Sequence, residues 1–165
     1  MKIIVISDSH GSFEEVNKII RQNSKADVVA FCGDGSSDLD YAKQQFTDKM
    51  FLSVRGNCDW CSSDAFLQEI TLCGKKIVIT HGHLHGVKEG YSRISCLGHD
   101  LGANIVLFGH THLPHLSYDG RILLMNPGSV AFGNQYGLID IDDDTGKINA
   151  ELFPKNKYNP PITID

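Results

Sequence analysis

The chain has 165 residues, of which 41% are hydrophobic, and it carries a formal net charge of -5. This length and composition fit one buried core, so we predict a single domain over residues 1–165. The acidic balance, with lysine and arginine scattered along the sequence, argues against a nucleic-acid-binding protein. No apolar run approaches the roughly 18 residues of a membrane span, and no secretory leader is evident, which predicts a cytoplasmic protein without a membrane partner.

Short apolar segments in the sequence predict buried β-strands, because they are β-branched and end at glycine or polar residues. These segments are 3–6, 28–31, 51–54, 77–79 and 105–108. Ser12, with Glu15 three residues later, predicts the start of a helix whose apolar face begins at Val16. A second short helix is expected over residues 38–46, so the first half should form a βαβαβ unit with parallel strands.

The second half of the chain is expected to be richer in strands. Its predicted elements are a hairpin over 66–72 and 76–79, a helix over 92–101, a hairpin over 116–118 and 121–125, and a strand over 138–141. The first hairpin would turn at Gly74-Lys75 and the second at Asp119-Gly120. Residues 154–165, which include two consecutive prolines, are expected to be loosely held.

Side chains that bind metal ions follow the ends of the predicted strands. They are Asp8, His10, Asp34, Asn57, His81, His110 and His112. Loops at the carboxyl ends of strands in an open α/β sheet bring such groups together. Imidazole and oxygen ligands suit Mn, Fe, Co, Ni or Zn, whereas Ca and Mg prefer oxygen alone. Seven groups are too many for one four-coordinate ion. If one carboxylate bridges, they could hold two ions about 3.5–4 Å apart, the usual arrangement for phosphoryl-transfer hydrolysis.

These side chains belong to short motifs that occur in a fixed order between residue 1 and about residue 133. The motifs are Asp8-Ser-His10, Gly33-Asp34, Gly56-Asn57-Cys58-Asp59, His81-Gly-His83 and Gly109-His110-Thr-His112. In this order they resemble the calcineurin-like metallophosphoesterase superfamily, and within it the small bacterial and archaeal phosphodiesterases of the YfcE type. The resemblance implies a four-layer α/β sandwich, in which two central mixed β-sheets are flanked by helices.

The resemblance also implies a role for each side chain. Asp8, His10 and His112 would hold one metal ion, Asn57, His81 and His110 would hold the other, and Asp34 would bridge the two. Asn57, Cys58, His81 and His110 are the expected catalytic residues. Manganese is the expected metal, with Ni, Co, Fe or Zn as alternatives.

The expected activity is hydrolysis of a small phosphoester, with a phosphodiester favoured. A hydroxide between the two ions would attack phosphorus in line. One alternative is a phosphomonoesterase, which would differ in the shape of its pocket. The other is a non-catalytic scaffold of the same fold, like the vacuolar-sorting subunit of retromer. Such scaffolds tend to lose ligands, whereas all seven are present here, which favours an enzyme.

Cys58 departs from the commoner pattern of the family, Gly-Asn-His-Asp, in which the histidine is placed to protonate the leaving group. A thiol has a reference pKa near 8.5 and donates hydrogen bonds weakly. The general acid therefore stays open, with His83 and His85 as alternatives to Cys58, while Asp59 is expected to support the motif. Cys58 and Cys61 also form a CxxC pattern. Five irregularly spaced cysteines nevertheless indicate reduced thiols rather than a redox motif or a disulfide framework.

Further expectations concern the surroundings of the site and the assembly. Residues 126–129, Asn-Pro-Gly-Ser, are expected to form a fixed turn beside the site. Arg55 could contact phosphate or pack beneath the Gly56 turn, and packing is favoured. A homo-oligomer, either a dimer or a tetramer, is plausible because the strand-rich half could leave a sheet edge open.

Overall fold

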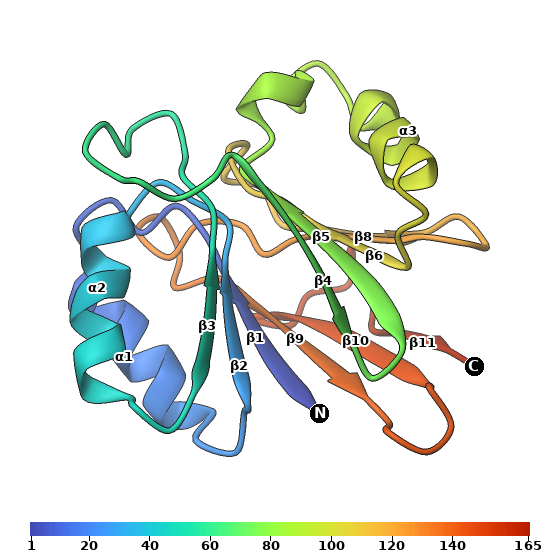
Figure 1. Ribbon diagram of the computed structural model, residues 1–165, viewed down its shortest axis with the longest axis horizontal. Helices are drawn as coiled ribbons and strands as arrows, with labels where there is room; N and C mark the ends of the chain where they lie inside the picture. The colour runs from blue at the N-terminus through green and yellow to red at the C-terminus, as the bar shows by residue number, and fades with distance from the viewer.

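The computed structural model describes residues 1–165 and contains two β-sheets that lie face to face (Figure 1). The strands are β1 (Lys2–Ile6), β2 (Val28–Phe31), β3 (Met50–Ser53), β4 (Leu67–Leu72), β5 (Lys75–Thr80), β6 (Ile105–Leu107), β7 (His115–Tyr118), β8 (Leu123–Asn126), β9 (Tyr136–Ile141), β10 (Ile148–Phe153) and β11 (Ile162–Ile164). The helices are α1 (Phe13–Gln22), α2 (Ser36–Gln45), α3 (Ser92–Asp100) and the short 3-10 helix η1 (His83–His85). None of the helices combines the length and hydrophobicity needed to cross a bilayer.

The layers follow from which side chains each sheet buries. One sheet has the order β11-β10-β9-β1-β2-β3 and the other has the order β4-β5-β6-β8-β7. Helices α1 and α2 cover the outer face of the first sheet, and α3 covers the outer face of the second (Figure 1). This arrangement confirms the expected α/β fold with two mixed sheets flanked by helices.

Strand β1 shows why its sequence is apolar at every position. Ile3 and Val5 point into the central core between the two sheets, whereas Ile4 and Ile6 pack against the helices. Successive side chains of a strand point to opposite faces, so a strand that is covered on both faces needs a continuous apolar run. Both layers of core therefore meet at β1.

Parallel pairing sets the position of the functional loops. Strands β1, β2 and β3 are mutually parallel, as the predicted βαβαβ unit requires, and β5, β6 and β8 are parallel in the other sheet. The carboxyl ends of parallel strands meet at one edge of a sheet. Figure 1 shows the loops after these strands gathered at the upper edge of both sheets.

Three predictions for the strand-rich half were wrong in detail. Four residues, 119–122, connect β7 and β8, rather than Asp119-Gly120 alone, because Tyr118 pairs with Leu123. The β4-β5 hairpin turns at Cys73 and Gly74, one residue earlier than expected, because Lys75 already pairs with Leu72. Both turn residues have positive φ, 48° and 71°, as a two-residue turn with the twist of a hairpin requires. The end of the chain is also not loose throughout. Residues 162–164 form β11, which pairs antiparallel with β10 at the edge of the first sheet.

Candidate metal centre

The expected metal ligands from both sheets come together at the shared upper edge. Asp8 and His10 follow β1, Asp34 follows β2, Asn57 follows β3, His81 follows β5, and His110 and His112 follow β6. Backbone hydrogen bonds hold neighbouring loops together, from Asp8 N to the Gly33 carbonyl at 2.9 Å and from Gly109 N to the His81 carbonyl at 3.1 Å. Backbone hydrogen bonds alone therefore hold these loops together.

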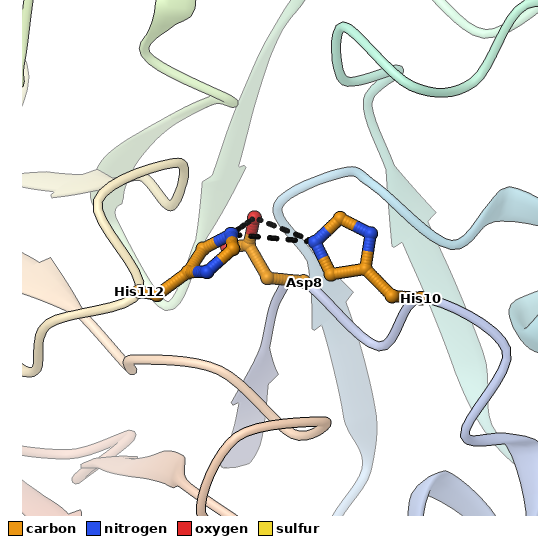
Figure 2. A group of neighbouring side chains, drawn as sticks. All are labelled: Asp8, His10 and His112. Carbon is orange, nitrogen blue, oxygen red and sulfur yellow. Dashed lines mark hydrogen bonds and ion pairs between the residues drawn. The ribbon is translucent and has the colours of Figure 1, made fainter.

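One group of side chains, the Asp8 group, consists of Asp8, His10 and His112 (Figure 2). The Nε2 atoms of the two histidines lie 3.3 Å apart, and Asp8 Oδ1 lies 3.1 Å from His112 Nε2 and 3.8 Å from His10 Nε2. Asp8 Oδ1 is buried without any hydrogen bond, whereas Oδ2 accepts bonds from the Ser7 hydroxyl and the His110 backbone N–H. A buried acceptor without a partner costs free energy. Two imidazole nitrogens and an unpaired carboxylate oxygen around one point are a donor set that fits a divalent cation.

A second group, the His81 group, consists of Asp34, His81 and His110. His81 Nε2 lies 3.3 Å from Asp34 Oδ2 and 3.2 Å from Asn57 Oδ1, so the Asn57 amide joins the group. His81 Nδ1 lies 2.7 Å from the carbonyl oxygen of Cys32. When Nδ1 donates its proton to that carbonyl, Nε2 presents a lone pair to the cluster, as it must in order to bind a metal.

Asp34 lies between the two groups. Its carboxylate belongs to the His81 group and also forms a cluster with His10 and Cys58, in which all the donor atoms lie within 4.8 Å of one another. The carboxylate is almost completely buried, and the backbone N–H of Cys58 donates to its Oδ1 at 2.7 Å. This is the position that a bridging carboxylate would need.

The charges in the centre are strongly coupled. Burial would raise the pKa of Asp34, but His81 together with the backbone N–H and the thiol of Cys58 outweighs it and holds the pKa well below its usual range. Burial raises the pKa of Asp8, against the opposing effect of His81. Burial and the neighbouring His81 together lower the pKa of His110 to about 4, so the His110 ring is neutral at pH 7 and its lone pair is available.

The backbone at the centre adopts conformations that L-residues seldom take. Five of the expected ligands have positive φ: Asp8 (55°), His10 (42°), Asp34 (60°), His110 (68°) and His112 (57°). Such residues cost free energy and cluster at functional sites, where the surrounding structure fixes them. Neighbouring glycines make the close approach of the loops possible. A Cβ on Gly56 would collide with the Asp34 carboxylate, and one on Gly109 would collide with the Ser7 hydroxyl and with Asp8.

Comparison with known proteins identifies the family of this chain. The calcineurin-like phosphoesterase superfamily domain matches residues 1–144. The chain belongs to this superfamily. It is 29% identical to the probable metallophosphoesterase YsnB of Bacillus subtilis over 154 residues, which cover 90% of this chain and 89% of the relative. It is 28% identical to the phosphodiesterase YfcE of Escherichia coli K12, with 86% of this chain and 89% of the relative covered. Among solved structures, a predicted phosphoesterase from Streptococcus pneumoniae TIGR4 has a TM-score of 0.78 and 27% identity, covering 99% of this chain and 96% of the other.

The metallophosphoesterase centre is supported by polar residues outside the two groups. Asp59 is buried, and its carboxylate accepts hydrogen bonds from the backbone N–H groups of Asp34, Gly35, Ser36 and Gly56. It therefore supports the motif, as expected. The 126–129 turn supports the other side, where the Asn126 side chain donates to the Gly109 carbonyl and the Ser129 hydroxyl donates to the Asp8 carbonyl.

The candidates for the general acid lie at different places around the centre. Cys58 is exposed, its Sγ lies 3.2 Å from Asn57 Nδ2, and burial together with Asp34 raises the pKa of its thiol. The His83 ring lies 5.3 Å from the His81 ring and 6.0 Å from the His110 ring, so His83 borders the His81 group. His85 has no ring contact or hydrogen bond to either group.

Two further side chains lie near the candidate metal centre. The sequence left two roles open for Arg55 and gave none for Phe132. The Arg55 guanidinium packs over the Phe66 ring at 4.5 Å and donates to the Ser62 carbonyl at 3.3 Å, so its contacts are with the segment before β4. Phe132 stacks on His112, with 5.1 Å between ring centroids and 22° between ring planes. No motif predicted Phe132, although its place just after the 126–129 turn was a signal that could have pointed to it.

Proposed function

We propose that this metallophosphoesterase hydrolyses a phosphodiester with two divalent metal ions bound at the Asp8 and His81 groups. The observation that carries the proposal is the unpaired, buried Oδ1 of Asp8, which faces two imidazole nitrogens that themselves lie 3.3 Å apart. A protein that had no use for a cation would gain by pairing this oxygen. A relative named as a phosphodiesterase, YfcE, supports the choice of a diester.

Asp8, His10 and His112 would hold one ion, and Asn57, His81 and His110 would hold the other, with Asp34 shared between them. The ions would supply Lewis acidity at the phosphoryl oxygens and a nucleophilic water at neutral pH. The rest falls to the protein, which must hold imidazoles neutral and carboxylates ionised. The lowered pKa of Asp34 and the lowered pKa of His110, about 4, provide this state at those two residues at pH 7, whereas burial raises the pKa of Asp8, and, against burial, Asp34 and Asp8 raise the pKa of His81, so these two would need the cation to reach it.

The residues around the ions would orient the ester. His81 is fixed by its hydrogen bond to the Cys32 carbonyl, and Asn57 is fixed beside it, so an ion at the centre would meet a rigid set of ligands. His81 and His110 would act on the phosphate through the ion that they hold, and Cys58, which borders Asp34, could donate a hydrogen bond to it. Cys58 is a weak donor with a raised pKa, so esters that leave as stable anions should react fastest.

Manganese is the metal we propose, with Ni or Co as substitutes, because four of the seven donors are imidazole nitrogens and Mg favours oxygen. The test is to remove metal from the protein with a chelator, add single metals back, and assay an aryl phosphodiester, an aryl monoester and cyclic nucleotides. Activity should vanish on chelation, return with Mn, Ni or Co more than with Mg, and be greatest for the aryl diester.

A matched pair of variants distinguishes loss of a metal ligand from loss of a histidine elsewhere in the protein. His112→Gln should lose most activity at limiting metal. His99→Gln should keep it, because His99 belongs to neither group and forms its ion pair with Asp119. Full activity in chelator, or a monoester cleaved faster than every diester, would refute the metal requirement or the diester preference respectively.

A further inference from the structure

Phe132 is exposed although it is a large apolar residue beside the candidate metal centre. Its side chain is 71% exposed. One face of its ring lies against His112, and its centroid is 6.1 Å from the His10 ring. His10 and His112 carry the paired Nε2 atoms of the Asp8 group. The ring therefore stands at the rim of that group, with one face covered and the other face open.

The position of Phe132 is fixed by the backbone. The Ser129 hydroxyl accepts a hydrogen bond from the Phe132 N–H at 3.2 Å and donates to the Asp8 carbonyl at 2.8 Å. The Ala131 N–H also donates to the Asp8 carbonyl, at 3.3 Å, and the Asn134 N–H closes the turn onto the Val130 carbonyl at 3.0 Å. Phe132 thus keeps a set distance from the same residue whose carboxylate faces the expected ion.

An aromatic ring on a hydrogen-bonded turn, with one face against His112 and most of its surface exposed, is suited to stacking. Aromatic faces attract other flat rings in offset or stacked geometries, beyond the gain from buried area alone. A bare apolar surface next to a polar centre is a common feature of ligand sites. Leu113, which follows His112, is 65% exposed but is aliphatic and does not present a planar face.

We propose that the open face of Phe132 stacks on a flat aromatic group of the substrate ester, either an aryl ring next to the phosphate or a nucleobase linked to it through a sugar. The inference rests on the proposed function, because it assumes that the phosphate occupies the metal centre. It adds the class of the substrate, an aromatic phosphoester. It also makes Phe132 the residue that determines this preference.

The experiment measures binding rather than turnover, so its outcome does not depend on hydrolysis. The Mn-loaded protein is titrated by calorimetry with phenylphosphonate and with methylphosphonate, which share the anionic head and differ in the ring. A second pair, adenosine monophosphate and ribose 5-phosphate, separates a nucleobase from a simple aryl ring. The variants are Phe132→Ala, Phe132→Leu and Phe132→Tyr, with Leu113→Ala as the matched control on the neighbouring loop.

Wild-type protein should bind the ring-bearing member of at least one pair more tightly. Phe132→Ala should weaken that member by about 3- to 30-fold, as expected for loss of one stacking contact, and change its ring-free partner by less than about two-fold. Phe132→Tyr should retain the preference, Phe132→Leu should lose most of it, and Leu113→Ala should keep it. The pair that responds identifies the ring as aryl or nucleobase.

Metal content of each variant distinguishes stacking on a ligand from support of His112. If Phe132→Ala weakens both members of each pair equally, or loses manganese, Phe132 only orients His112 and the proposal is overturned. Equal affinity of wild-type protein for ring-bearing and ring-free ligands also overturns it. Normal ring-dependent binding without hydrolysis of any ester would instead refute the proposed function and leave the stacking site intact.

Discussion

The Oδ2 atom of Asp59 accepts a hydrogen bond from the backbone N–H of Asp34 at 2.8 Å. The same oxygen accepts from Gly56 N at 2.8 Å, and Oδ1 accepts from Gly35 N and Ser36 N, each at 2.9 Å. One buried carboxylate therefore fastens the loop after β2 to the loop after β3. Asp34 and Asn57 take their positions from that connection.

Asp59→Asn should destabilise the fold. An amide keeps the shape but has one acceptor oxygen and no charge, so some of the four N–H groups, which are buried or partly buried, lose their hydrogen-bond acceptor. Hydrogen bonds to charged groups contribute about 1.5–3 kcal/mol each, and we expect a loss on the order of 2–4 kcal/mol after relaxation. Urea denaturation measures it, with Asp48→Asn as an exposed control. A free energy of unfolding within about 0.5 kcal/mol of wild type would contradict this role.

The Asp59 contribution should also depend on pH with a defined sign. Burial would raise the pKa of Asp59, but the four N–H donors outweigh burial and lower it. A group whose folded-state pKa is depressed contributes stability above its unfolded pKa, roughly 3.9, and loses it as pH falls through the folded pKa. The difference in unfolding free energy between wild type and Asp59→Asn should thus be constant from pH 6 to 8 and shrink below about pH 4. A difference that grew on acidification would show the opposite linkage.

Asp34→Asn and His10→Gln should affect the metals differently. The first removes the only charge shared between the two groups, and a neutral amide cannot offset the repulsion of two cations. The second removes one imidazole from the Asp8 group alone. Metal content after gel filtration should therefore fall at both sites in Asp34→Asn, with turnover nearly abolished, whereas His10→Gln should keep one ion and regain activity at high Mn. The reverse pattern would mean that Asp34 does not bridge.

Cys58→His should reduce the dependence of the rate on the leaving group. The thiol is a weak donor, and both burial and Asp34 raise its pKa, so it assists poor leaving groups little. An imidazole at this position can donate a proton near neutral pH. The ratio of rates for nitrophenyl and alkyl diesters should fall by about 10-fold or more in the variant, in line with the usual size of general acid catalysis. If the ratio does not change, the proton comes from elsewhere, with His83 at the border of the His81 group as the next residue to test.

Removal of residues 161–165 should destabilise the first sheet. Strand β11 pairs with β10, and the partly buried Ile162 and Ile164 pack against the central core. Losing these contacts should cost roughly 1–3 kcal/mol, from the apolar area exposed. Urea denaturation checks this, and removal of Asp165 alone should have little effect because its bond to Lys147 is exposed. An unchanged midpoint in the shorter chain would show that β11 adds nothing.

The residues that the sequence could predict are those whose signal is local. Ile3 to Ile6 had to be a buried strand, because a run that is apolar at every position needs cover on both faces. The short apolar runs before Asp8, Asp34 and His81 predicted that these residues follow strand ends, where the structure has them. Neither inference required knowledge of distant contacts.

The features that the sequence missed depend on distant partners. Residues 162–164 are too short to show a periodic pattern, and they form a strand only because β10 offers them an edge. Phe132 has no motif, and its stacking on His112 arises from two loops that meet only after folding. The sequence predicted that Asp59 supports its own motif, but not that its carboxylate reaches residues 34–36, which lie more than 20 positions away in the chain.

The left-handed backbone at His112 has a consequence for how such a chain can evolve. A glycine there would relieve a conformational cost of roughly 1 kcal/mol while deleting an imidazole whose ring donates no hydrogen bond to the backbone. At this position the backbone conformation favours glycine, whereas metal binding requires the imidazole. The imidazole at this position is therefore kept at a conformational cost, and its stacking on Phe132 offsets part of that cost.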